Sequence, residues 1–254
     1  MKRIIGRVFL VGAGPGAPDL LTLRAAEVLK RAEVVFHDAL VHPEVLALAS
    51  RAEKIAVGKR CGRFATAQQF INKRLVDAAG KYQVVVRLKG GDPMLFGRAQ
   101  EEIAALQAAG VPCEVVPGVT SGLAAAAEAH ASLTQRGVAR SVAFVTPRVA
   151  AGEAPSEWVK SVAAADTAVI YMGVGHAQAI SAALIAAGLP RDLPVLVAEN
   201  ASLPESRRIA LTLEELPEIA RYGVSGPAVI LLGRAFAAAL SASARDALQR
   251  YAHA

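Results

Sequence analysis

Short runs of apolar, mostly β-branched residues alternate along the chain with longer segments that are rich in Ala, Leu and Glu. Runs such as Val8–Val11 and Val34–Phe36 are apolar at every position, which is typical of strands buried inside a sheet. The longer segments between them have the length and composition of helices. This strand–helix alternation predicts an α/β fold with mostly parallel sheets and helices on both faces.

The amino-terminal half predicts one such sheet, which would end near Pro117 and Gly118. Its strands are expected at Val8–Val11, Val34–Phe36, Lys54–Val57, Val84–Leu88 and Glu114–Val116. Its helices are expected at Leu20–Arg31, Pro43–Ala49, Thr66–Ala78 and Ala99–Ala109.

The carboxy-terminal half predicts a second set of elements. Its strands are expected at Ser141–Thr146, Ala168–Tyr171, Pro194–Ala198, Arg208–Thr212 and Ala228–Leu232. Its helices are expected at Gln178–Ala187, Leu213–Arg221 and Arg234–Arg250. Because no low-complexity linker separates the halves, we expect two α/β domains, 1–117 and 118–254, with a fixed ligand-binding cleft between them.

Composition and charge narrow the classes of partner. The chain has 254 residues, of which 54% are hydrophobic and 5% aromatic, and its net charge is +6. Scattered basic residues and few aromatic ones argue against a nucleic-acid surface and favour an anionic small molecule such as a polycarboxylate. No apolar stretch is long enough to span a membrane, and the two cysteines, Cys61 and Cys113, fit a reducing cytoplasm.

A glycine-rich loop follows the first expected strand. Gly12, Gly14 and Ala17 match the dinucleotide-binding pattern G-x-G-x-x-A, and Asp38 follows the second strand at a suitable distance. Two prolines in this loop argue against NAD binding, because Pro15 and Pro18 cannot donate backbone N–H bonds. Asp19 then has the features of an N-cap, so the helix would begin too late to cradle a pyrophosphate. A plain turn between strand and helix is the alternative.

Two more loops of this kind follow later strands. One loop is Gly90-Gly91-Asp92-Pro93, whose glycines would let the backbone approach a ligand closely and whose Asp92 offers a carboxylate acceptor. The alternative is that Asp92 only caps a tight turn. Pro117-Gly118-Val119-Thr120-Ser121 opens an Ala-rich helix. Because open α/β sheets bind ligands at the carboxyl ends of their strands, three such loops indicate a binding site there.

The three loops resemble the tetrapyrrole methylase family, the class III methyltransferases that use S-adenosylmethionine (SAM). Further matching segments cover nearly the whole chain in order: Gly58-Lys59-Arg60, Phe96-Gly97-Arg98 with Glu101-Glu102, Leu133-Thr134 with Arg136-Gly137, Ala139-Arg140-Ser141, Tyr171-Met172-Gly173 and Pro227-Ala228. The chain is most similar to the branch that methylates uroporphyrinogen III twice to give precorrin-2, and it resembles the free-standing form. The departures from the family pattern are Ala39 in the segment Asp38-Ala39-Leu40-Val41, together with Gln135, Thr146-Pro147-Arg148 in place of Thr-Gly-His, and Ala201.

The resemblance implies that SAM is the cofactor and that it is released as S-adenosylhomocysteine. The residues that match the family's SAM contacts are Pro15, Gly90, Gly91, Asp92, Leu95, Thr120, Ser121, Met172, Ala201 and Ala228. An apolar adenine needs slots of backbone and small side chains, and these residue types supply them. Without the resemblance, Met172 would be read as a core methionine.

The resemblance also implies which residues take part in the reaction. Methyl transfer to a ring carbon leaves a cation that must lose a proton, so a general base is needed. Asp38 matches the family's proton acceptor and Lys59 its proton donor. Arg98, Glu101 and Arg136 match positions of substrate binding or proton transfer, and arginine suits the eight carboxylates of uroporphyrinogen. The alternative for each arginine is a surface cation or an ion pair, and no metal site is expected.

Other functions stay open at this point. The nearest alternative is a later precorrin methyltransferase of the same family, and more distant ones are an NAD-dependent oxidoreductase and a non-enzymatic anion-binding module. The resemblance further implies a homodimer, while the composition and the lengths of the apolar stretches predict that the chain binds neither nucleic acid nor membranes.

Overall fold

The computed structural model describes residues 5–57, 64–149 and 156–241. The chain divides into two compact units, Met1–Thr120 and Ser121–Ala254. The sequence had placed this boundary three residues earlier, after Pro117.

The first unit alternates strands and helices from end to end. Its strands are β1 (Arg7–Gly12), β2 (Val34–His37), β3 (Glu53–Ala56), β4 (Val84–Lys89) and β5 (Cys113–Val116). Its helices are α1 (Leu23–Arg31), α2 (Pro43–Ala47), α3 (Phe64–Ala79) and α4 (Ala99–Ala108), and a short 3-10 turn, η1 (Pro18–Leu20), precedes α1. Every predicted strand and helix of this half is present, with ends that differ by a few residues.

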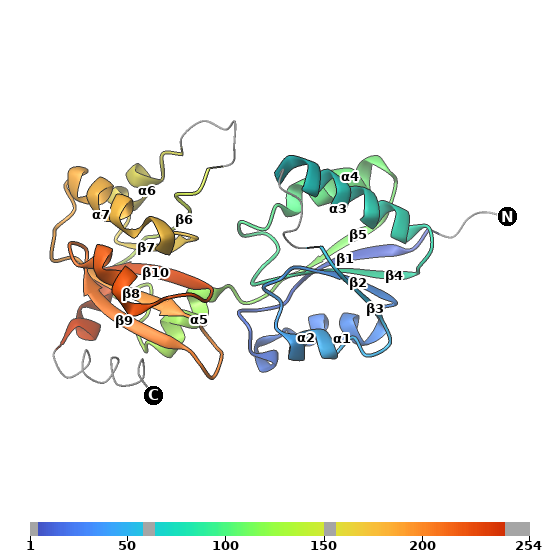
Figure 1. Ribbon diagram of the computed structural model, residues 1–254, viewed down its shortest axis with the longest axis horizontal. Coiled ribbons are helices and arrows are strands. Elements are labelled where there is room, and N and C mark those ends of the chain that lie inside the picture. Colours follow the sequence, from blue (N-terminus) through green and yellow to red (C-terminus); the bar gives the residue numbers. More distant parts are fainter. Residues whose placement is uncertain (1–4, 58–63, 150–155, 242–254) are drawn as a thin grey trace. The chain divides into compact units, whose positions relative to one another are not determined.

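All strands of the first unit are parallel, in the order β3-β2-β4-β1-β5. The chain first moves toward one edge, from β1 to β2 and β3, and then reverses toward β4 and β5. Because crossovers between parallel strands are right-handed, this reversal puts α1 and α2 on one face of the sheet and α3 and α4 on the other (Figure 1). Strand β4 therefore lies between β1 and β2. The helices that follow these two strands, α1 and α2, cover the face of the sheet opposite to α3 and α4.

The core of the first unit has two layers, one on each side of the sheet. Val11, Val86 and Leu88 pack with α1 and α2, while Leu10 and Val85 pack with α3 and α4. Successive residues of a strand point to opposite faces, so Arg87 and Lys89 of β4 lie on the same face as Val85. Two basic residues thus enter the layer under α3 and α4.

The second unit contains strands β6 (Val142–Val145), β7 (Thr167–Tyr171), β8 (Pro194–Glu199), β9 (Arg207–Thr212) and β10 (Ala228–Gly233). Its α-helices are α5 (Ser121–Glu128), α6 (Trp158–Ala164) and α7 (Ala177–Ala186), and its 3-10 segments are η2 (Val174–His176), η3 (Leu216–Tyr222) and η4 (Arg234–Leu240). Elements α6, α7 and η3 pack on one face of the sheet, and α5 and η4 contact the other.

The second sheet, in the order β6-β7-β10-β8-β9, corrects the prediction of two mostly parallel sheets. Only β6 and β7 pair in parallel, while β7–β10, β10–β8 and β8–β9 are antiparallel. The sequence contained the reason, because only residues 200–206 join β8 to β9. A parallel pair needs a crossover of about a dozen residues or more, and a short loop makes a hairpin.

Three helical details also differ from the predictions. Asp19 does not cap α1; it lies in η1, and the side chain of Thr22 accepts the capping bond from Ala25 N. The expected helices at 213–221 and 234–250 are 3-10 segments where the structure describes them, and α6 was not predicted. Among the described residues, no helix is long and apolar enough to cross a bilayer.

Candidate functional site

The loops that follow β1, β4 and β5 meet at the carboxyl edge of the first sheet. Ala13 N donates to the Lys89 carbonyl at 2.7 Å. Gly14 and Gly91 exchange two backbone hydrogen bonds, at 3.2 and 2.7 Å. Pro15, Gly90 and Gly91, predicted from separate motifs, are therefore brought together by backbone pairing.

Glycine is required where these loops cross. A Cβ on Gly12 would lie 2.6 Å from the backbone of Gly118 and 2.7 Å from the carbonyl oxygen of Gly91. Gly91 has a φ of +66°, and a Cβ there would meet only the Cα of Thr120, at 3.8 Å. The close approach at Gly12 shows that the loops pack backbone to backbone. The space around Gly91 leaves its backbone open to a ligand.

Asp92 ties two of these loops together. Its Oδ1 accepts from Met94 N at 2.7 Å, and its Oδ2 accepts from Gly118 N at 2.9 Å. The sequence had offered a ligand acceptor or a capping residue, and the structure shows the second role directly. Since each carboxylate oxygen can accept more than one bond, Asp92 can still receive a ligand hydroxyl.

Asp38 stands directly after β2, beside the loop that follows β4. The exposed side chain of Leu40 reaches that loop, because a Cβ on Gly90 would lie 3.3 Å from the Leu40 Cβ. Met94 and Phe96 of the β4 loop are exposed as well. Apolar side chains thus accompany the Asp38 carboxylate at this edge of the sheet.

The Asp38 carboxylate is held by a buried arginine. Arg87 Nη2 of β4 donates to Asp38 Oδ1 at 2.6 Å, and the two side chains are 3% and 30% exposed. Another guanidinium nitrogen of Arg87, Nη1, donates to the carbonyl of Leu88 at 3.2 Å. One oxygen of Asp38 is therefore fixed by a charge-assisted bond, and the carboxylate stays partly open to solvent.

The carboxylate of Glu102 in α4 binds the side chains of both Arg87 and Lys89. Its Oε1 accepts from Arg87 Nε at 2.9 Å and its Oε2 accepts from Lys89 Nζ at 3.0 Å. Gln68 of α3 also donates to Oε1, at 3.2 Å. The Glu102 side chain is 0% exposed, so this network of two cations and two carboxylates is buried at Glu102 and reaches solvent at Asp38.

Charge assignments in this network follow from its pKa shifts. Burial acts to lower the pKa of Arg87, but attraction to Asp38 and Glu102 outweighs it and raises that pKa overall. Burial and repulsion by Arg87 lower the pKa of Lys89, although Glu102 opposes this. Arg87 is consequently the firmly charged partner of Asp38.

The motifs in the sequence assigned no role to Arg87, Lys89 or Glu102. A usable signal was present, because Arg87 and Lys89 are charges at alternate positions of an otherwise apolar strand. Buried charges need partners, and such a pattern therefore points to an acid on a neighbouring element.

Arg98 and Glu101 form an ion pair with each other. Arg98 Nε and Nη2 donate to the two Glu101 oxygens at 2.7 and 2.8 Å. Arg98 has a φ of +57° at the start of α4, a backbone region that non-glycine residues rarely occupy. The ion-pair alternative for Arg98 is thus the observed state, and the pair is about half exposed, which leaves it accessible to an anion.

The remaining predicted reaction residues are Lys59 and Arg136. Lys59 lies outside the described residues. Arg136 is exposed on a tight turn that is closed by two backbone bonds between Gln135 and Ala139, at 2.9 and 2.8 Å. The turn uses only the backbone of Gln135, so its side chain can depart from the family pattern without changing the turn.

Predicted cofactor residues of the second unit gather at one end of its sheet. Ala228 begins β10 and pairs with Glu199, and the next residue, Val229, pairs with Tyr171. The loops after β7 and β8, which carry Met172 and Ala201, therefore leave the sheet beside Ala228. Ser121 joins them, because a Cβ on its neighbour Gly122 would lie 2.6 Å from the Tyr171 hydroxyl.

Backbone strain marks these loops. Met172 has a φ of +56° and a side chain that is 44% exposed, so it is not a core methionine. Asn200 and Ser202 have φ values of +52° and +78°, whereas Ala201 between them does not have a positive φ. Alanine in place of the family's glycine at 201 therefore costs no backbone strain, and strained residues of this kind cluster at ligand sites.

Glu199 holds the same end of the second sheet. Its Oε1 accepts from Ser225 N and Gly226 N at 2.7 and 2.6 Å, and its Oε2 pairs with the Arg207 guanidinium. Burial acts to raise the pKa of Glu199, but these hydrogen bonds lower it overall. The turn that leads into Ala228 is thus fixed by one buried carboxylate.

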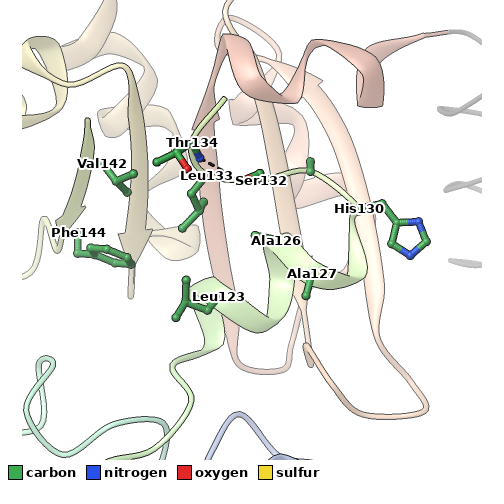
Figure 2. A pocket seen from close by; sticks show the side chains of 10 residues that line it. Leu123, Ala126, Ala127, His130, Ser132, Leu133, Thr134, Val142 and Phe144 are labelled. Atoms are coloured by element: carbon green, nitrogen blue, oxygen red, sulfur yellow. Dashed lines mark hydrogen bonds between the residues drawn. The ribbon is translucent and has the colours of Figure 1, made fainter. Parts of the chain in front are cut away.

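A hollow of about 630 Å³ lies elsewhere in the second unit, between α5, the segment after it and β6 (Figure 2). Leu123, Ala126, Leu133, Val142 and Phe144 line it, and none of the predicted site residues that the structure describes is among its lining. Size alone does not identify the reaction site, because this hollow lacks an acid or a base besides His130. Among the described residues, no group of three His, Cys, Asp or Glu side chains could hold a metal ion.

The described residues fit SAM as a ligand. In the first unit, the open backbone at Gly91 and the side chain of Leu95 are of a kind that a flat adenine can contact. In the second unit, the small side chains of Ala201 and Ala228 and the exposed Met172 are of the same kind. The remaining acceptor capacity of Asp92 suits hydroxyl or ammonium donors.

Comparison with known proteins points to one family. The chain matches the family described as Tetrapyrrole (Corrin/Porphyrin) Methylases over residues 7–217. It is 42% identical over 241 residues to the uroporphyrinogen-III C-methyltransferase of Paracoccus denitrificans, covering 94% of this chain and 84% of that protein. It is 45% identical over 233 residues to the siroheme synthase of Azotobacter vinelandii, covering 91% of this chain and 50% of that one. The chain thus spans about half the length of several of its curated relatives.

Comparison with solved structures indicates the same family. The native uroporphyrin III C-methyl transferase of Thermus thermophilus is 44% identical and has a TM-score of 0.81, over 92% of this chain and all of that one. The structure of that enzyme with S-adenosylhomocysteine has a TM-score of 0.79, 43% identity and the same coverage.

Proposed function

The chain belongs to the tetrapyrrole methylase family, and on that premise we propose that it transfers methyl groups from SAM to two ring carbons of uroporphyrinogen III, giving precorrin-2. One observation carries the proposal: the Asp38 carboxylate is held at the edge where three glycine loops meet. The relatives in Paracoccus and Thermus bear names with the same activity, which supports it.

In the proposed reaction, bound SAM supplies an activated methyl group on a sulfonium. The work left to the protein is alignment, exclusion of water and removal of a proton from the methylated ring. Asp38 is proposed as the base that accepts this proton at its oxygen Oδ2, since Oδ1 is engaged by Arg87. Lys59 is proposed as a proton donor by its motif alone.

Substrate carboxylates are proposed to bind Arg98 and Arg136. Arg98 is already aligned by Glu101 and is about half exposed, and guanidinium groups bind carboxylates. Arg136 extends from a rigid turn in the second unit. Exposed Leu40, Met94 and Phe96 would contact apolar parts of the macrocycle.

An anaerobic assay with SAM and uroporphyrinogen III, read by mass spectrometry after oxidation, tests this function. A gain of two methyl masses is expected. If S-adenosylhomocysteine binds but no methyl is transferred, the substrate is a later precorrin. If neither occurs, the proposed function is wrong.

We further propose that the chain forms a homodimer and acts in the cytoplasm. Exposed Leu123, Val138 and Phe144 near the β6 edge of the second sheet support an association surface. The free thiol of Cys113 suits a reducing compartment. Light scattering that reports the monomer mass at working concentration would contradict the dimer, and cell fractionation tests the compartment.

A further inference from the structure

Strand β4 has an unusual feature for a central strand, namely two buried cations at its carboxyl end. Arg87 and Lys89 are 3% and 4% exposed, and Glu102 between them is 0% exposed. Moving such groups out of water is costly, and replacing a buried ion cluster by apolar side chains is often neutral or stabilising. Stability therefore gives no reason to retain this network.

Strands β2 and β4 are also linked at their opposite, amino-terminal ends, by simpler means. There the exposed Glu33 accepts backbone bonds from Gln83 N and Val84 N, and its own N–H donates to the Val84 carbonyl. Holding these two strands together thus requires no buried cation. Unlike this link, the buried network ends on the carboxylate of Asp38.

The geometry of the network restricts how Asp38 can move. Arg87 donates from three nitrogens, to Asp38, to the Leu88 carbonyl and to Glu102. Glu102 is restrained in turn by Lys89 and Gln68. Lys89 is covered by the following loop, because a Cβ on Gly97 would lie 3.0 Å from its Cε. A planar guanidinium that is held at Glu102 and at the Leu88 carbonyl presents Nη2, the donor to Asp38, in one direction only.

We infer that Arg87 is a positioning residue for the reaction, which holds the Asp38 carboxylate in its reactive orientation and is itself held in place by Glu102. The inference rests on the proposed role of Asp38 as base. Arg87 lies beneath Asp38 in the sheet and is nearly fully buried, so it acts through Asp38 and not on the substrate.

A kinetic double-mutant cycle tests the inference, with Arg87→Lys, Asp38→Asn and the combined variant. Lysine keeps the charge and loses the planar fork, so we expect kcat to fall about 30-fold, the size of effect that a small misplacement of a reacting group produces. The KM for the tetrapyrrole and the affinity for S-adenosylhomocysteine should stay within about threefold. In the Asp38→Asn background, Arg87→Lys should change kcat less than about twofold, because nothing is left to position.

Two further variants keep the result interpretable. Glu33→Gln weakens the other link between β2 and β4, and it should lower the melting temperature with kcat unchanged. Glu102→Asp, which retains the charge and retracts the carboxylate, should repeat the loss of kcat and the non-additivity if Arg87→Lys does not fold.

Each outcome decides the matter. Additive losses in the cycle, or an equal loss of kcat in Glu33→Gln, would overturn the positioning role while leaving the proposed function intact. Normal turnover by Asp38→Asn would remove the proposed base and the inference with it. A wild-type chain that transfers no methyl group would overturn the proposed function itself.

Discussion

Glu102 in the first unit and Glu199 in the second are both almost fully shielded from solvent, yet their partners differ in kind. Glu102 is neutralised by the side chains of Arg87 and Lys89, and Arg87 continues to Asp38. Glu199 receives two backbone N–H groups and the partly exposed Arg207. The first arrangement holds the side chain of Asp38, our proposed base, while the second shapes a loop.

Sheet topology explains why the two units use these different means. All strands of the first sheet are parallel, so every carboxyl end, with its loop, lies at one edge, and side chains from several strands can meet there. The second sheet is mostly antiparallel, so the site end combines the finish of β7 and β8 with the start of β10. The first unit therefore brings a carboxylate beside its glycine loops, whereas the second unit contributes loops without such a buried ion network.

Replacing Glu102 by glutamine should produce the largest loss of stability. The amide has one acceptor oxygen for two buried cations, and its NH2 group faces their donors. Removing one partner of a buried ion pair costs about 3–5 kcal/mol. Urea unfolding at pH 7 would measure the effect, and a loss below about 1 kcal/mol, the usual worth of an exposed pair, would show that the network is hydrated in solution.

Glu199→Gln should cost less stability but more cofactor affinity. The variant loses charge-assisted bonds, while the Gln oxygen can still accept from a backbone amide, so we expect about 1–3 kcal/mol. The loop before Ala228 should loosen and weaken S-adenosylhomocysteine binding about tenfold, equivalent to about 1.4 kcal/mol. Isothermal titration calorimetry would check this, with Arg87→Lys as the variant whose affinity should stay unchanged. Equal affinity losses in both variants would erase the contrast between the units.

The acid sensitivity of the second unit follows from the lowered pKa of Glu199. A carboxylate whose pKa is lower in the folded state stabilises the fold above its unfolded pKa of about 4.3, and this stability is lost as the pH falls through the folded value. The stability difference between the wild type and Glu199→Gln should therefore be full at pH 7 and narrow steadily below about pH 4.3. Urea titrations across this range would measure it, and a constant difference would mean that Glu199 is not stabilised as an anion.

Arg98→Ala should have the smallest effect on stability. The Arg98–Glu101 pair is about half exposed, and such pairs contribute at most about 1 kcal/mol. The KM for the tetrapyrrole should nevertheless rise about tenfold, because a carboxylate contact is lost, with kcat changing much less. Steady-state kinetics would separate the two, and an unchanged KM would mean that the pair is only a surface feature.

The sequence by itself determined the strand–helix order of the first unit and the glycine loops at its strand ends. Local rules were sufficient there, since apolar runs, intervening helices and glycines that tolerate unusual backbone angles are all read from neighbouring residues. Resemblance to a family added the site residues, of which Pro15, Gly90 and Gly91 lie together, as do Met172, Ala201 and Ala228.

Tertiary structure decided the features that depend on distant residues. The mixed second sheet depends on which strands pair across the chain, and apolar patterning does not encode the partner of a strand. Asp92 finds a partner in the distant Gly118, which leaves its carboxylate less free than the motif implied. The buried network joins Asp38, Arg87 and Glu102 from three separate elements. A charge in a strand reveals that it needs a partner, but only the folded sheet shows which carboxylate supplies it.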